Sequence, residues 1–109
     1  NKIYLKPGYT DLRMSINGLK MTIARDLELN PYEKDVLFLF CGRKSDRIKG
    51  LIWEGTGFLL LYKVVEDGRF IWPRNKEEAL SLTQEQFKLL RTGFSIESSI
   101  REIHPIRAC

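Results

Sequence analysis

The amino-acid sequence predicts an α+β fold, in which an antiparallel β-meander sheet of four to five strands packs against an N-terminal helix and a C-terminal helix. Three observations lead to this prediction: a helical apolar pattern early in the chain, apolar runs joined by glycine turns after it, and a helix-start signal after those. The chain has 109 residues, which suits one domain. We expect the domain to span residues 1–94, with 95–109 as a C-terminal extension that is either helical or extended.

The first elements are a short strand and a helix. Lys2–Leu5 is a strand candidate, and Pro7-Gly8 is expected to break the chain after it. Thr10 or Asp11 can cap the helix. Its apolar residues recur at spacings of three and four: Leu12, Ile16, Leu19, Ile23 and Leu27. Gly18 inside this run costs about 1 kcal/mol relative to alanine, which a close packing contact would explain.

The middle of the chain has the composition of a β-sheet. Val36–Cys41 is an apolar run typical of a strand covered on both faces. Arg47–Glu54 and Phe58–Val65 flank Gly55-Thr56-Gly57, a strong hairpin signal. Asp67-Gly68 is a second turn and predicts a further strand, Arg69–Trp72, which Pro73 ends. After it, Thr83 and Gln86 form a capping box for a C-terminal helix that runs to about Phe94.

The hairpin predicts which side chains share a face of the sheet. A two-residue turn at Gly55-Thr56 places one set together: Arg47, Lys49, Leu51, Trp53, Phe58, Leu60, Tyr62 and Val64. The opposite face holds Ile48, Ile52, Leu59, Leu61 and Val65. We interpret this second face as the core, covered by the Leu12–Leu27 helix, and expect the first face to be open or to pack under the C-terminal helix.

Positive charge is concentrated in the β region. The chain carries 18 basic and 14 acidic residues, a net charge of +4. Residues 41–76 hold eight basic and four acidic residues, so this region alone accounts for the whole net charge. We expect the basic side chains of this region to contact phosphate groups, with the last two as extensions of the site: Arg43, Lys44, Arg47, Lys49, Arg69 and Arg74. The alternative is an ordinary solvated loop and sheet edge.

The aromatic residues of the same region allow two interpretations. Exposed rings would anchor a protein interface or stack on bases, whereas buried rings would belong to the core. The candidates for an interface are Trp53, Phe58, Tyr62 and Trp72.

No catalytic or cofactor-binding motif is evident. His104 is the only histidine, Cys41 is expected to be a buried small apolar residue, and the glycines do not form a phosphate-binding loop. We therefore predict a protein that is not an enzyme and has no metal, cofactor or small-molecule substrate. The longest apolar run is far short of the ~20 residues of a membrane helix, and no signal peptide is evident, so we expect no membrane partner and a cytoplasmic location.

Several blocks in a fixed order resemble a known family. They are Tyr9–Arg13, Asn17–Leu19, Asp46–Lys49, Trp53–Phe58, Tyr62-Lys63 and Gly68–Pro73. This pattern is similar to that of the TnpB-type (Orf2-like) accessory proteins of the insertion-sequence-66 family of bacterial transposable elements. The motif positions are Asp11, Arg13, Gly18, Asp46, Gly55, Gly57, Gly68 and Pro73.

The resemblance implies a small bacterial protein, encoded beside a transposase and needed for efficient transposition; it implies no catalytic residues. Together with the basic β region, it leads us to expect a non-enzymatic accessory factor for DNA transposition that acts on DNA or on the transposase–DNA complex. The alternative is a protein–protein interaction module that binds the transposase or self-associates without touching DNA.

Overall fold

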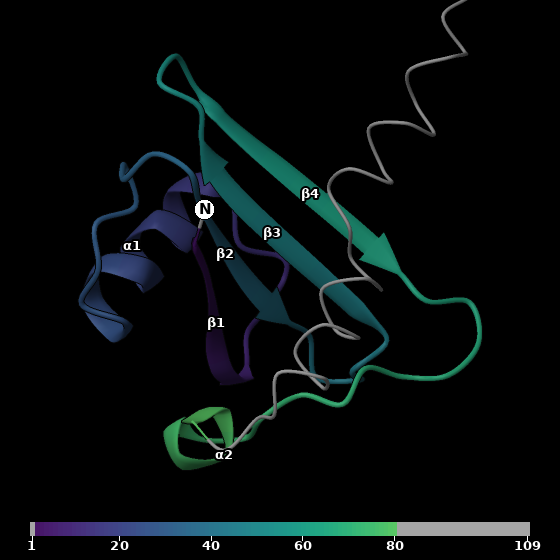
Figure 1. Cartoon of the computed structure of the whole chain (residues 1–109). Coiled ribbons are helices and arrows are strands. Elements are labelled where there is room, and N and C mark those ends of the chain that lie inside the picture. The colour runs from purple at the N-terminus through teal and green to yellow at the C-terminus, as the bar shows by residue number, and fades with distance from the viewer. Residues whose placement is uncertain (1, 81–109) are drawn as a thin grey trace, which may run out of the picture.

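The computed structural model describes residues 2–80, which form a four-stranded mixed sheet with a helix on one face (Figure 1). In chain order the elements are β1 (Lys2–Tyr9), α1 (Ile16–Asp26), β2 (Val36–Cys41), β3 (Arg47–Trp53), β4 (Phe58–Val64) and α2 (Lys76–Leu80). The α+β class is confirmed. The helix predicted after Thr83, the extension at 95–109 and His104 lie outside the described residues.

The sheet is not the antiparallel meander that the sequence predicted. Its order is β1-β2-β3-β4, and β2, β3 and β4 pair antiparallel, but β1 pairs parallel with β2. Parallel neighbours need a long crossover connection, and residues 10–35, which include α1, provide one. The prediction was wrong because the apolar pattern of the helix shows that it packs on the sheet, but not that it connects two parallel strands.

β1 continues through Pro7-Gly8 instead of ending before it. The pairing with β2 shifts register between Leu5 and Tyr9, and Gly8 takes a φ of 77° that favours glycine. Proline is tolerated because β1 is an edge strand. The free edge at Gly8 is used by a later segment, since its amide donates to the carbonyl of Pro73 at 2.8 Å.

α1 begins four residues later than expected, and Ser15 is its N-cap. The Ser15 hydroxyl accepts a hydrogen bond from the amide of Gly18 at 3.3 Å. Asp11 cannot cap the helix because its carboxylate binds the side chain and the amide of Arg13. The expected close contact at Gly18 is present, because a Cβ there would lie 3.1 Å from the Cβ of Met14.

The β3–β4 hairpin has the predicted register. Trp53 pairs with Phe58 and Arg47 with Val64, and the Glu54 amide donates to the Gly57 carbonyl at 2.8 Å across the turn. Gly55 has a φ of 89°, as expected for the first central residue of a type II′ turn. Val36–Cys41 also has the predicted bounds and is buried along its whole length.

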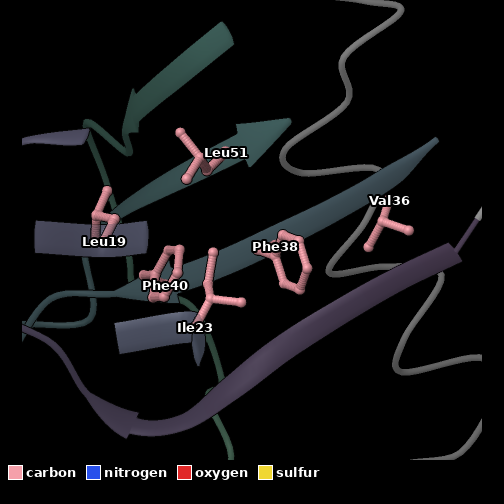
Figure 2. Packing of buried hydrophobic residues seen from close by; sticks show 6 residues of the cluster. All are labelled: Leu19, Ile23, Val36, Phe38, Phe40 and Leu51. Atoms are coloured by element: carbon pink, nitrogen blue, oxygen red, sulfur yellow. The ribbon is translucent and has the colours of Figure 1, made fainter. Parts of the chain in front are cut away.

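α1 covers the face opposite to the one predicted. Figure 2 shows Leu19 and Ile23 of α1 against the ring side chains of β2 and Leu51 of β3, in a cluster with Leu19, Ile23, Val36, Phe38, Phe40 and Leu51. The other face holds a second cluster, formed by Leu37, Leu39, Cys41, Ile48 and Trp72. Both faces are apolar, so side-chain alternation alone could not tell which one the helix would take.

Arg69–Trp72 is not a strand, which corrects the fifth strand of the prediction. After β4 the chain passes under one end of the sheet and reaches α2 beside β1 (Figure 1). The Phe70 amide donates to the Ser45 carbonyl at 2.6 Å, and the Trp72 indole donates to the Lys6 carbonyl at 2.8 Å. These bonds tie the segment to the loop between β2 and β3 and to β1, and the segment does not pair along β4. The short helix α2 was not predicted.

Candidate functional site

An open groove lies at the end of the sheet where β1 and β2 end and β3 begins. The turn after β1 crosses toward α1 there and faces the loop that joins β2 to β3. The groove has a volume of about 880 Å³ and is lined by Tyr9, Thr10, Asp11, Leu12, Arg13, Gly42, Arg43, Lys44, Arg47 and Tyr62. We refer to this feature below as the basic groove.

Four cations line the basic groove. Arg43 and Lys44 are exposed on the loop, and within residues 2–80 neither forms an ion pair. Arg47 contacts Asp46 at 2.9 Å, and Arg13 contacts Asp11 at 3.0 Å.

The basic groove stays positive even though two of its arginines are paired. Counting Asp11 and Asp46 against the four cations leaves two positive charges. Both carboxylates remain ionised, because a hydrogen bond from Arg13 lowers the pKa of Asp11 to about 2 and one from Arg47 lowers the pKa of Asp46. Such exposed pairs are weak, so a phosphate group can compete for the guanidinium groups.

Lys49 has a different place from the other predicted phosphate contacts. Its ammonium donates to the carbonyl of Leu12 and lies 5.5 Å from the centre of the Tyr62 ring. Lys49 therefore ties the turn after β1 to β3 and supports one wall of the groove. The close approach at this wall also needs Gly42, where a Cβ would lie 3.1 Å from Leu12 Cδ1 and 3.2 Å from Arg47 Cγ.

The two predicted extensions lie outside the groove. Arg69 is exposed and follows Gly68 in the chain, next to the residue that binds the Ser45 carbonyl. Arg74 is exposed and contacts Glu78 at 2.9 Å, a pair that raises the pKa of Arg74 and lowers that of Glu78. Both segments reach the same end of the sheet as the groove through backbone hydrogen bonds to Ser45 and Gly8.

The aromatic interface candidates separate into three environments. Trp53 and Phe58 lie at the opposite end of β3 and β4, with ring centres 4.9 Å apart, and both contact Tyr32. Trp72 is only 6% exposed and belongs to the core, which leaves little of its ring for a partner. Tyr62 lines the basic groove and is 53% exposed.

Sequence reasoning missed the contribution of the turn after β1. Tyr9, Thr10 and Arg13 line the groove although they precede the basic region of the chain by about thirty residues. Thr10 is 7% exposed, and its Oγ1 is the one buried side-chain polar atom without a hydrogen-bond partner among residues 2–78. A signal existed, because Tyr9–Arg13 is one of the resemblance blocks, but the helix was expected to start there.

Metal-ligating clusters and an activated thiol are both absent from the described residues. Between residues 2 and 80 no group of three His, Cys, Asp or Glu side chains is placed to hold a metal ion. Cys41 is buried as expected, and burial raises the pKa of its thiol to about 11, which keeps it protonated and a poor nucleophile. Across the same residues, no helix has the length and apolar character that a bilayer crossing requires.

Comparison with known proteins places the chain in a family. Two proteins of Sinorhizobium fredii (strain NBRC 101917 / NGR234) are similar to it, both named only as uncharacterized proteins. The first, y4jC, is 37% identical over 83 residues, which cover 76% of this chain and 70% of the relative. The second, y4hO, is 30% identical over 92 residues, which cover 84% and 79%. No solved structure matches the chain. The model of the family described as IS66 Orf2-like protein matches residues 1–101, and the chain therefore belongs to that family.

Proposed function

We propose that this protein is a non-enzymatic accessory factor of DNA transposition that contacts DNA, or a transposase–DNA complex, through the basic groove. The family is associated with IS66 insertion sequences, which supports a transposition-associated accessory role. The observation that carries the DNA contact is the convergence of Arg13, Arg43, Lys44 and Arg47 on one open groove.

The arrangement suits a polyanion. Arg43 and Lys44 extend from the loop without an ion pair in the described part of the chain, so they are available to release counterions from phosphates. Arg13 lines the same groove from a separate segment of the chain, which allows phosphate contacts on two sides of a DNA backbone. We assign the groove a binding role, because Asp11 in the groove engages Arg13 and Asp46 beside it engages Arg47.

The experiment is a matched charge reversal. Arg43→Glu combined with Lys44→Glu should weaken binding to a labelled oligonucleotide at least tenfold at low salt, measured by fluorescence anisotropy. The control is Lys2→Glu combined with Lys34→Glu, which makes the same change in net charge at exposed positions of the opposite end of the sheet. Equal weakening by both pairs would indicate a general charge effect and would contradict a groove-specific contact.

A second candidate function is self-association through β4. This strand is one edge of the sheet, and in the part of the chain that the structure describes it pairs only with β3. Its sequence carries a single charge, Lys63. Antiparallel pairing with a second copy, centred on Leu61, would place each Lys63 opposite Leu59 of the partner copy and so avoid like-charge contact.

Light scattering after size exclusion tests this candidate. A dimer that Val64→Lys converts to a monomer would support it, because Val64 is exposed and a charge on an edge strand opposes pairing. A monomer at every concentration would rule out self-association. The transposase would then be the partner to test for a protein–protein interaction module.

A further inference from the structure

The basic groove contains two tyrosines that are neither buried nor packed on other rings. Tyr9 is 49% exposed and Tyr62 is 53% exposed, and both line the groove among its cations. Across the described residues, the close ring pairs all lie elsewhere in the fold. Ring surface is thus available inside a positively charged hollow.

The hydroxyl group of each ring accepts one long hydrogen bond. Ser45 Oγ donates to the Tyr9 hydroxyl at 3.4 Å, and Arg47 Nη1 donates to the Tyr62 hydroxyl at 3.4 Å. The ammonium of Lys49 lies against the Tyr62 ring as well. These contacts restrict the rings, and a restricted side chain loses less rotamer freedom when a ligand covers it, which favours stacking.

The chemistry of the groove distinguishes between forms of DNA. In a duplex the faces of the bases are stacked on one another, and only phosphates, sugars and base edges are accessible. An unpaired strand offers phosphates to cations and base faces to aromatic rings at the same time. The groove presents both partners within one hollow of about 880 Å³, and the Tyr62 hydroxyl accepts a hydrogen bond from Arg47.

We propose that the basic groove binds unpaired nucleotides of single-stranded DNA, with base stacking on Tyr62 and Tyr9 and phosphate contacts from Arg43, Lys44 and Arg13. This inference rests on the proposed function, because it specifies the form of DNA that the same groove accepts. It assigns Tyr62 a binding role that net charge alone would not reveal.

The test compares a single strand of about 12 nucleotides with the duplex of the same sequence, using fluorescence anisotropy at low salt. We expect the single strand to bind more tightly. Tyr62→Leu should weaken single-strand binding roughly 5- to 100-fold and weaken duplex binding much less, because the stacked bases of a duplex do not use the ring face. Tyr62→Phe should retain most of the affinity, since it keeps the ring.

Two controls separate the possible outcomes. Tyr32→Leu removes an equally exposed tyrosine at the other end of the sheet and should have no effect, and circular dichroism checks that each variant folds. Duplex binding as tight as single-strand binding, with Tyr62→Leu unchanged, would overturn this inference and leave the proposed function intact. Failure of both forms to bind would overturn the proposed function and this inference together.

Discussion

The two ends of the β3–β4 hairpin use similar residues in opposite ways. At the turn end, Tyr32, Trp53 and Phe58 pack on one another, and the ammonium of Lys20 lies 5.1 Å and 5.2 Å from two of these rings. At the other end, Tyr62 has no close ring partner among the described residues and lines an open groove with three arginines.

Similar residue types at the two ends of the hairpin therefore do not imply the same role, because the contacts around them differ. The aromatic and cationic groups at the turn end contact each other, whereas Arg43 and Lys44 of the basic groove have no ion pair among the described residues. We therefore expect changes at the turn end to affect stability and changes at the groove end to affect binding.

The largest contrast should come from truncating one ring at each end. Phe58→Ala should lower the free energy of unfolding by about 2–3 kcal/mol, because Phe58 packs on two rings and on the α1 cluster. Tyr62→Ala should lower it by less than about 1 kcal/mol, because half of its surface is already exposed. Urea titrations of the two variants measure both values, and equal losses would contradict the contrast.

A second contrast lies within the turn itself. Gly55→Ala should destabilise the protein by about 1–2 kcal/mol, because a side chain is strained at a φ of 89°. Gly57→Ala is the matched control, since a Cβ there meets nothing within 4 Å and φ is not positive. Thermal unfolding should leave Gly57→Ala unchanged or slightly stabilised. A neutral Gly55→Ala variant would show that the turn conformation is not required.

Removing the unpaired hydroxyl beneath the groove should increase stability. Thr10→Val replaces a buried oxygen that has no partner among the residues with described side chains, and should raise the free energy of unfolding by about 1 kcal/mol. Thr22→Val is the control and should lower it by about as much, because Thr22 donates to the Gly18 carbonyl at 3.0 Å. Opposite signs in urea titrations support this assignment, and a loss in both variants would refute it.

The smallest effect concerns the pH dependence of the groove. The pKa of Asp11 is about 2 in the folded protein, below its ordinary value of 3.8, because Arg13 binds the charged form. A carboxyl whose pKa is lowered by folding stabilises the folded protein at pH values above its pKa in the unfolded chain. That contribution disappears as the pH falls through the folded pKa of about 2. NMR titration of the Asp11 carboxyl should show a midpoint near 2, and a midpoint near 4 would mean that the pair does not form in solution.

Local features of the fold were predictable from the sequence. The glycines at Gly55 and Gly57 predicted the turn and, through the period of two, the register from Arg47 to Val64. The run Val36–Cys41 predicted a buried strand with the correct bounds. The loop cations Arg43 and Lys44, and Arg47 after them, line the same groove because they are near neighbours in the chain, and their contact with phosphate stays a prediction.

Features that depend on distant segments were not predictable. The parallel pairing of β1 with β2 depends on where α1 crosses, and both faces of the sheet are apolar enough to accept it. Arg13 joins the groove because its turn folds back over β3, which no local pattern records. The segment after β4 does not form the predicted strand, because it makes hydrogen bonds with Ser45 and Lys6, which lie far from it in sequence.

The salt dependence of DNA binding by the unmodified chain tests the central claim most directly. If the basic groove engages three to five phosphates, the logarithm of the association constant should fall against the logarithm of salt concentration with a slope between about −2 and −4.5. A flat response, or no binding to either DNA form at micromolar protein and low salt, would contradict the account.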